Sequence, residues 1–235
     1  MLRRALGQGI GGKHVLRRRC SRLSSEIRSV IRFGDVLVES RRHPAAAASS
    51  RSSLLAGDTL PREVMMHLEW IAKKYNLRQD MILLGHPSNL RRQLAMKFFR
   101  DELGLDVEYV SISKDTTESD LKQRREMNGD SITFVDQAPV RAAKLGRVLV
   151  LDGLEKAERN VLPCLNNLLE NREMALEDGT FLMSNENYHS IMSQKSGRTN
   201  SSSSTPHPPT PNPNPLIVPC HPDFVVCALA LPSPP

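Results

Sequence analysis

The sequence lacks the residue patterns of a disulfide scaffold, a zinc site and a membrane-spanning helix. Its four cysteines (Cys20, Cys164, Cys220 and Cys227) form no CxxC pair, and no histidines stand at a metal-ligand spacing beside them. Neither a disulfide framework nor a structural zinc site is therefore indicated, and a reducing compartment is the default. No apolar run approaches the roughly 18 residues that a transmembrane helix needs, so we expect no transmembrane segment.

Aromatic residues are scarce, and the basic charge is confined to one end of the chain. The sequence holds one Trp and three Tyr. Of its 32 Lys and Arg residues, 12 lie within residues 1–51 beside three acids, which leaves 20 basic and 23 acidic residues, a net −3, in residues 52–235. Nucleic-acid binding by the body of the chain is disfavoured, because such surfaces need basic patches or interleaved aromatic and basic residues.

The N-terminal segment is rich in arginine and has no acid. Residues 1–25 contain seven Lys or Arg and no Asp or Glu, a composition typical of a mitochondrial transit peptide. We therefore predict a transit peptide over 1–25 and a mitochondrial matrix location; the alternative is a disordered basic tail. Residues 26–57 are predicted to be a linker, since their Ser-, Arg- and Ala-rich part from 40 onward has no apolar periodicity.

Residues 58–192 have the pattern of an α/β domain. Val64, Leu68, Ile71 and Tyr75 recur at three- and four-residue steps and predict a helix. Short apolar runs predict strands, with helical segments between them, over 81–84, 107–112 and 147–152. A βαβ order favours a parallel sheet with helices on both faces, a three-layer αβα fold. We expect the strands that begin at Met81 and Val148 to be neighbours in that sheet.

The C-terminal part changes composition twice. Residues 199–219 are almost entirely Ser, Thr, Pro and Asn, which cannot form a packed core. We therefore predict a disordered Ser/Pro-rich insert over 193–221. Residues 222–235 follow it, and the apolar run 224–231 within them predicts a further buried strand.

One strand-to-helix loop partly matches a phosphate-binding P-loop. Against the pattern GxxxxGK[ST], the chain has Gly85, four residues, and then Leu90, Arg91 and Arg92, so only the first glycine agrees. Asp152 ends a later buried strand, where P-loop proteins place the acid that holds the metal's shell. Taken alone, this pattern is also that of an ordinary strand-to-helix turn and a strand-end acid.

Two longer strings carry a family resemblance. The segments DTTESDLKQRRE (115–126) and GLEKAERNVLPCLNNLLENRE (153–173) resemble the N-terminal AAA+ module of proteins that also carry von Willebrand factor A domains. More distantly, the arrangement is similar to the midasin and MoxR-type AAA+ ATPases. The resemblance covers about residues 58–192, resumes at 222–232 where a sensor-1 strand would lie, and implies that the chain is a piece of a longer protein.

The resemblance implies a AAA+ αβα sandwich, ATP and Mg²⁺ as cofactors, and a mitochondrial location. As partners it implies other subunits of a AAA+ ring or further modules of the full-length protein. It assigns Asp152 to the metal. It assigns nucleotide binding to Gly85, His86, Pro87, Ser88, Asn89, Leu90, Arg91 and Arg92.

The chain departs from the family pattern where hydrolysis is performed. AAA+ enzymes follow the metal-binding Asp with a Glu that polarises the attacking water, but Gly153 follows Asp152, and Glu155 stands two positions later, where we expect it to point elsewhere. The position of the polar sensor-1 residue falls near Leu231. No catalytic residue is therefore assigned.

Two functions remain open at this point. The first is an ATP-binding module of a mitochondrial AAA+ ATPase that hydrolyses little or nothing by itself. The second is a non-enzymatic pseudo-ATPase that supplies only ring contacts. The two differ in whether residues 85–92 still bind phosphate.

Overall fold

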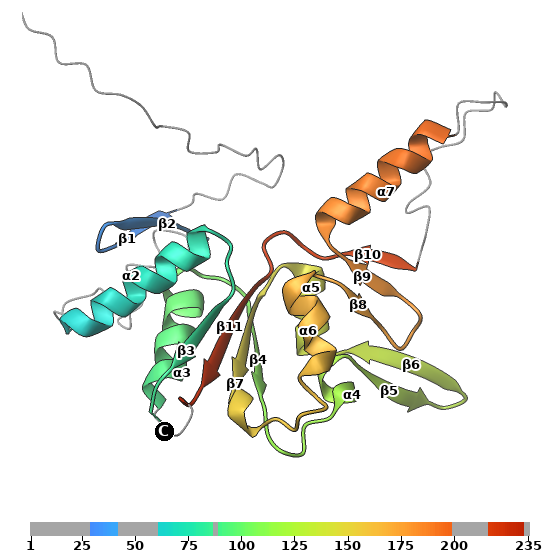
Figure 1. Cartoon of the computed structure of the whole chain (residues 1–235), viewed down its shortest axis with the longest axis horizontal. Coiled ribbons are helices and arrows are strands. Elements are labelled where there is room, and N and C mark those ends of the chain that lie inside the picture. The colour runs from blue at the N-terminus through green and yellow to red at the C-terminus, as the bar shows by residue number, and fades with distance from the viewer. Residues whose placement is uncertain (1–28, 42–60, 87–88, 199–215, 233–235) are drawn as a thin grey trace, which may run out of the picture.

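The core of the molecule is a four-stranded parallel sheet (Figure 1). The computed structural model describes residues 29–41, 61–86, 89–198 and 216–232. Each strand of the sheet is paired in parallel with its neighbours. In spatial order the strands are β3 (Met81–Leu84), β11 (Val225–Ala230), β7 (Val148–Asp152) and β4 (Val107–Ser111). The expected parallel α/β architecture is thereby confirmed.

The expectation that the Met81 and Val148 strands are neighbours is wrong, because β11 lies between them. Cys227 of β11 is opposite Met81 on one side and Val150 on the other. All six residues of β11 are buried. A strand that is apolar on both faces is most stabilised at the centre of a sheet, where it is paired along both edges. The core therefore does not end at 192, because its central strand comes from 225–230.

The sheet separates two apolar clusters, as its alternating side chains require. On β7, Val148 and Val150 pack into one cluster, and Leu149 and Leu151 pack into the other. Helices α2 (Arg62–Asn76), α3 (Asn89–Met96) and the π-helical turn η1 (Lys97–Glu102) lie on the first side; α5 (Ala138–Leu145) and α6 (Pro163–Glu170) lie on the second (Figure 1). This is the predicted three-layer arrangement.

The linker predicted over 26–57 contains a hairpin. Strands β1 (Ser29–Phe33) and β2 (Val36–Ser40) pair antiparallel, and Phe33 and Val38 are fully buried. The ring of Phe33 lies 5.0 Å from that of Phe98 in η1. The linker prediction is therefore wrong for 29–40, because burial of one apolar face against α2 and η1 stabilises strands that are marginal alone. Residues 42–57 lie outside the described residues, as does the predicted transit peptide.

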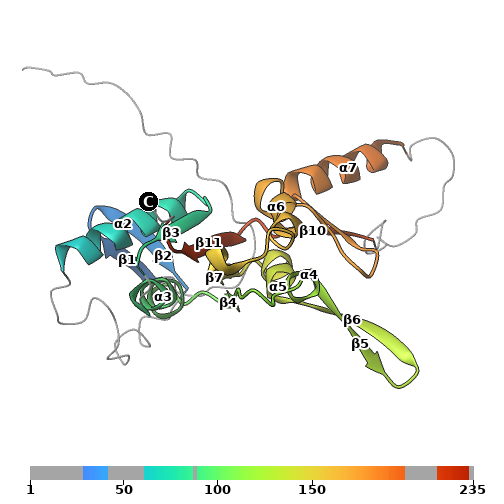
Figure 2. The same cartoon turned by 60° about the horizontal axis from the view of Figure 1, so that its bottom comes forward.

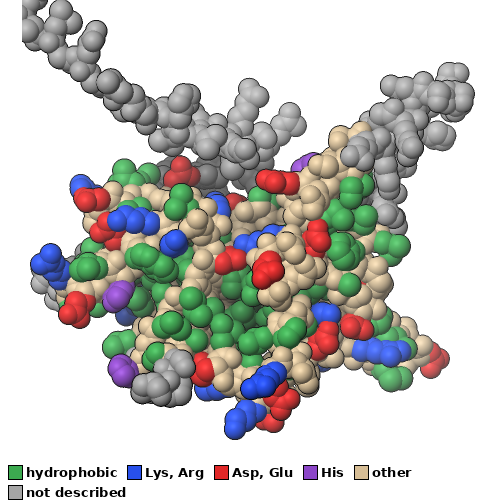
Figure 3. Space-filling view, viewed as in Figure 1, with side chains coloured by type: hydrophobic (Ala, Val, Ile, Leu, Met, Phe, Trp, Pro, Cys, Tyr) green, Lys and Arg blue, Asp and Glu red, His purple; other side chains and the backbone are tan. Residues whose placement is uncertain are grey.

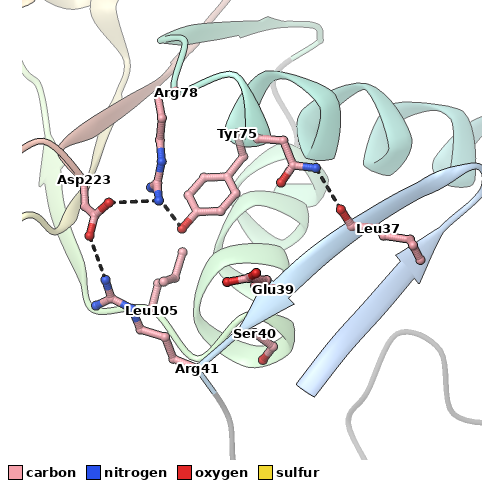
Figure 4. Close-up of a pocket in the computed structure, with 9 residues that line it drawn as sticks. Leu37, Glu39, Ser40, Arg41, Tyr75, Arg78, Leu105 and Asp223 are labelled. Atoms are coloured by element: carbon pink, nitrogen blue, oxygen red, sulfur yellow. Dashed lines mark hydrogen bonds and ion pairs between the residues drawn. The ribbon is translucent and has the colours of Figure 1, made fainter. Parts of the chain in front are cut away.

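A carboxylate ties this hairpin to the sheet (Figure 4). Asp223, just before β11, accepts a hydrogen bond from Arg41 at 3.1 Å and forms an ion pair with Arg78 at 2.8 Å. Arg41 follows β2 and Arg78 follows α2, so one carboxylate joins three segments distant in sequence. These side chains border a cavity of about 290 Å³.

A second hairpin projects from the body of the molecule (Figure 2). It consists of the antiparallel strands β5 (Gln123–Asn128) and β6 (Ser131–Asp136). The hairpin follows the short helix α4 (Glu118–Leu121) in the sequence. Arg124 and Arg125 therefore lie on a strand. Met127 and Ile132 face each other across the ribbon and are exposed.

The predicted insert over 193–221 is partly ordered at both ends. Helix α7 (Asn185–Arg198) extends into it, and β10 (Ile217–Pro219) pairs in parallel with β9 (Phe181–Met183). Strand β8 (Met174–Ala175) completes this small sheet. The prediction of disorder is wrong for these two ends, because β10 gains a strand partner; the stretch 199–215 lies outside the described residues.

One face of β3 carries exposed apolar side chains. Ile82 is 49% and Leu84 is 60% exposed. Ile82 borders a largely apolar cavity of about 440 Å³ between β3, β11 and α6, and Figure 3 shows apolar side chains gathered in the hollow at the middle of this face. Among the described residues, none of the helices combines the length and apolar character that a bilayer crossing requires.

Candidate functional site

The candidate site lies at the carboxyl edge of the parallel sheet, where open α/β sheets bind ligands. Strands β3, β7 and β11 end together there, so Gly85 and Asp152 lie at the same edge, as predicted. A cavity of about 500 Å³ opens beside them. It is lined by Asn89, Arg91, Arg92, Asp152, Glu155, Lys156, Leu229 and Leu231.

Four of the predicted nucleotide-binding residues surround the start of α3 at this cavity. Asn89, Arg91 and Arg92 line it, and Gly85 packs against the Arg91 side chain: a Cβ at Gly85 would stand 3.3 Å from Arg91 Cδ. A side chain at this position would have to shift the Arg91 side chain by a few tenths of an ångström. His86 is exposed, Leu90 is 71% exposed and does not line the cavity, and Pro87 and Ser88 lie outside the described residues.

Arg91 binds the ends of two strands. Its Nη1 donates to the carbonyl oxygen of Ala230 in β11 and, at 3.4 Å, to that of Leu83 in β3. Its Nε is buried and has no hydrogen-bond acceptor among the residues that the structure describes. Arg91 therefore lines the cavity while its guanidinium is bound to the ends of β3 and β11.

Arg92 is bound to the acid that was predicted to hold a metal. Its Nε and Nη2 lie 2.9 and 2.7 Å from Asp152 Oδ2. The hydroxyl of Tyr109, on β4, donates to the same oxygen at 2.7 Å. The Arg92 guanidinium also lies over the Tyr109 ring, 5.3 Å from its centroid. One carboxylate oxygen thus accepts hydrogen bonds from Arg92 Nε and from the Tyr109 hydroxyl, and Arg92 Nη2 is ion-paired with it.

These contacts determine the ionisation of Asp152. Burial opposes its charged form, but the hydrogen bonds from Tyr109 and Arg92 and the charges of Arg92 and Lys156 outweigh burial, so the pKa of Asp152 is lowered. The bond to Asp152 also raises the pKa of Arg92. Both groups are charged, and they form an ion pair in the lining of the cavity.

Gly153 turns the chain so that Glu155 and Lys156 face the cavity. Its φ of +87° is left-handed, and a Cβ there would stand 3.1 Å from the carbonyl oxygen of Ile112. The turn η2 (Leu154–Lys156) follows, and Glu155 Oε2 accepts a hydrogen bond from the Leu231 amide at 3.2 Å. The expectation that Glu155 points away from the site is therefore wrong, because the left-handed turn reverses the chain.

Sequence analysis missed two members of the site, Tyr109 and Lys156. Tyr109 lies on β4 opposite Val150, two residues before the strand end, and reaches Asp152 from there. Only the pairing of β4 with β7 brings them together. For Lys156, the Asp-Gly sequence at the strand end was the available signal, because a left-handed glycine allows the next residues to fold back.

The residues present do not fit Mg²⁺. This ion requires a near-octahedral set of oxygen ligands. Asp152 is already bound by two donors, Arg92 stands where a P-loop has its hydroxyl, and no group of three or more His, Cys, Asp or Glu side chains suited to a metal occurs among the described residues. Asp152 as a metal ligand stays a prediction that its contacts do not favour.

A polyphosphate fits the site better than a metal does. Arg91, Arg92 and Lys156 supply three positive charges to the cavity against two from Asp152 and Glu155, a net +1. The cavity also lies at the N-terminus of α3, whose free N–H groups attract anions. Positive charge and unused N–H donors are what a phosphate group requires.

The chain matches the model of a protein family and is similar to known proteins. Residues 80–234 match the model of the AAA domain, dynein-related subfamily. Over 135 residues the chain is 54% identical to mouse von Willebrand factor A domain-containing protein 8. The aligned segment covers 57% of this chain and 7% of the mouse protein. The chain therefore spans a small fraction of the length of its relative.

The fold was also compared with solved structures. A provisionally assigned ATPase of Cytophaga hutchinsonii, solved at 2.00 Å resolution, matches 72% of this chain and 38% of its own, with 12% identity and a TM-score of 0.41. At this level of similarity the match adds nothing to the assignment of function.

Proposed function

Because the chain belongs to the dynein-related subfamily of AAA domains, we propose that it is an ATP-binding AAA+ module that hydrolyses little or no ATP by itself. The observation that carries this proposal is the cavity at the carboxyl edge of the sheet, where Arg91, Arg92 and Lys156 converge on the N-terminus of α3. ATP is a polyanion of a size that a cavity of about 500 Å³ admits.

Two features support the absence of turnover. Gly153 occupies the position where the family's water-polarising Glu would stand, and its left-handed backbone disfavours any side chain there. Glu155 lines the cavity, but its carboxylate accepts the Leu231 amide. Loss of an acid–base group alone typically costs about 10²–10⁴-fold in rate.

Nucleotide binding is tested by calorimetry with ATP and ADP on the whole chain. We expect binding by the wild type and an affinity several-fold weaker for Lys156→Ala, because that substitution removes a cavity cation for which the described residues show no ion-pair partner. Arg125→Ala is the matched control: it removes the same charge from the exposed β5–β6 hairpin and should leave affinity unchanged. Equal loss in both variants would indicate only a general charge effect.

Hydrolysis is tested by phosphate release. We expect turnover below about 0.1 s⁻¹, against a typical enzyme median near 10 s⁻¹. Faster turnover would contradict the proposal, and Glu155→Gln would then show whether Glu155 is responsible.

A non-enzymatic assembly module is the second candidate. It is favoured by one observation, namely that Arg91 and Arg92 both have protein acceptors in the cavity wall. Millimolar ATP or ADP that fails to raise the melting temperature of the chain would support this candidate. In either case we propose that the module works in a AAA+ ring or together with further modules of a longer protein. Its membership of the AAA domains supports the ring, and the far greater length of its relative supports further modules.

We propose a mitochondrial matrix location, supported by the acid-free basic composition of residues 1–25. Cations in such a segment are drawn toward the negative side of the membrane, because the membrane potential contributes about 2.3 kcal/mol of free energy per charge per 100 mV. Replacing Arg17, Arg18 and Arg19 by Glu should leave the protein in the cytosol when it is followed by microscopy. Mitochondrial localisation that survives this change would overturn the proposal.

A further inference from the structure

We propose that Arg92 takes the place of the divalent cation in this site, so that the polyphosphate binds as the free anion without a metal. This inference rests on the proposed function and concerns the form in which the ligand is bound. It is carried by the three-way contact between Arg92, Asp152 and Tyr109.

The first step concerns the oxygen that a metal would need. Asp152 Oδ2 accepts hydrogen bonds from Arg92 Nε at 2.9 Å and from the Tyr109 hydroxyl at 2.7 Å. Arg92 Nη2 is ion-paired with the same oxygen at 2.7 Å. A cation approaching this oxygen would have to displace a guanidinium that is also held over the Tyr109 ring. A second positive charge at the same oxygen is repelled by the first.

The second step concerns what Arg92 can still donate. A guanidinium has five N–H donors in a rigid fork, and Asp152 uses Nε and Nη2. The side chain of Arg92 is 49% exposed and lines the cavity. Its remaining N–H groups are therefore available to a phosphate oxygen, and Arg92 can bridge the Asp152 carboxylate and an anion as a bound cation does.

The third step concerns charge balance at the cavity. Arg91 and Lys156 also line it, and Arg91 Nε is buried with no acceptor in the described part of the chain. Three cations offset by two carboxylates already favour an anion without help from solution. A metal that neutralises part of the polyphosphate charge would weaken this attraction, so excess Mg²⁺ should not improve binding.

The test is calorimetric titration of ATP into the whole chain, in EDTA and in excess Mg²⁺. For the wild type we expect dissociation constants that agree within about threefold, or tighter binding in EDTA. For Arg92→Ser, which removes the guanidinium and adds a hydroxyl, we expect binding in EDTA to weaken at least tenfold and part of it to return with Mg²⁺. Arg125→Ser, on the exposed hairpin, is the charge-matched control and should behave as the wild type.

Wild-type binding that is tenfold or more tighter with Mg²⁺ would overturn the inference and leave the proposed function standing. Absence of binding under both conditions would overturn the proposed function and the free-anion inference with it. A separate measurement decides whether Arg92 excludes a cation: electron paramagnetic resonance of Mn²⁺ added without nucleotide should show no bound ion for the wild type. Mn²⁺ bound by the wild type at submillimolar affinity would overturn that exclusion. Circular dichroism melting establishes that each variant is folded.

Discussion

Arginine partners of carboxylates recur at the ends of the strands. Asp152 is bound by Arg92, and Asp80, just before β3, is bound by Arg172 at 2.9 Å. Asp80 Oδ1 also accepts the Val226 amide at 2.8 Å and so joins β3 to β11 beyond their ladder. Arg172 reaches Asp80 from the end of α6. Such pairs attach helices to the edges of the sheet, because the planar guanidinium can donate to several acceptors at once.

Glu108 is the most enclosed acid of these pairs. It accepts hydrogen bonds from Arg141 at 2.9 Å and from Arg147 at 2.5 Å, and its side chain is 12% exposed. Burial opposes its ionisation, but the two arginines outweigh burial and lower the pKa of Glu108. A carboxylate with a lowered folded-state pKa stabilises the fold above the unfolded pKa, and this contribution is lost as the pH falls through the folded value.

We therefore expect Glu108→Gln to lower the free energy of unfolding at pH 7 by about 1–3 kcal/mol. The difference from the wild type should shrink as the pH falls below about 4.3, the ordinary pKa of Glu, and should vanish below the folded pKa. Urea unfolding at several pH values measures the difference in free energy of unfolding between the variant and the wild type. Glu126→Gln, on the exposed hairpin, serves as the control; a pH-independent difference for Glu108→Gln would contradict this account.

Asp223 is the second acid with two arginine partners. Arg41 and Arg78 are about half exposed, so their attraction is screened by solvent, and Asp223→Asn should cost about 1 kcal/mol. For a chain of this size that corresponds to a fall in melting temperature of about 2–4 °C. Asp35→Asn is the matched control, since Asp35 is 93% exposed and lies 3.8 Å from Arg32. Equal changes in the two variants would show that the Asp223 contacts do not stabilise the fold.

At the scale of elements, the β1–β2 hairpin behaves as part of the core. Phe33 contributes a ring with no exposed surface, packed against Phe98, and Val38 is 1% exposed. The other face of the hairpin points to solvent, where Val30 and Leu37 are each 60% exposed. The hairpin therefore buries one face, and the packing of that face against the core stabilises it.

We expect Phe33→Ala to destabilise the protein by about 3–5 kcal/mol, the usual cost of removing a buried aromatic ring. Val30→Ala, on the exposed face of the same strand, should change stability by no more than about 0.5 kcal/mol. Chemical denaturation of both variants measures the contrast. A small effect of Phe33→Ala would mean that the hairpin is not packed against η1 in solution.

At the scale of the whole molecule, the sheet is completed by the most distant segment of the chain. Strand β11 comes more than 70 residues after β7 and pairs with both β3 and β7. Its side chains enter both apolar clusters. The two apolar clusters are thus joined through β11. Within the described part of the chain, β11 is the strand with which β3 pairs in the sheet.

A chain that ends at residue 198 should therefore fail to unfold cooperatively on heating, because β3 loses its strand partner and both clusters lose buried side chains. Near-ultraviolet circular dichroism and calorimetry report this loss. The control is a chain that begins at residue 29 and keeps β11, which should retain a cooperative transition. A cooperative transition in the shorter chain would show that the core does not need β11.

Local patterns in the sequence were sufficient to locate most elements of the sheet and its helices. Met81–Leu84 and Val148–Asp152 are apolar runs bounded by polar or turn residues, and both are strands. The first has the expected bounds, and the second begins one residue after its predicted start at 147. The β1–β2 hairpin was missed because Arg32, Asp35 and Glu39 interrupt its short apolar pattern. Whether so short a segment forms strands depends on the surface that it packs against.

The sequence by itself determined the layered α/β class, the strand-end positions of Gly85 and Asp152, and the lack of a Glu after Asp152, because these depend on residue identity and on periodicity along the chain. Only the tertiary structure decided that β11 separates β3 from β7 and that Arg91 binds strand carbonyls. It alone also decided that Arg92 and Tyr109 share the Asp152 oxygen and that Glu155 turns into the cavity. Strand order and the partner of each charged group are set by distances through space between segments far apart in sequence, and no local pattern contains those distances.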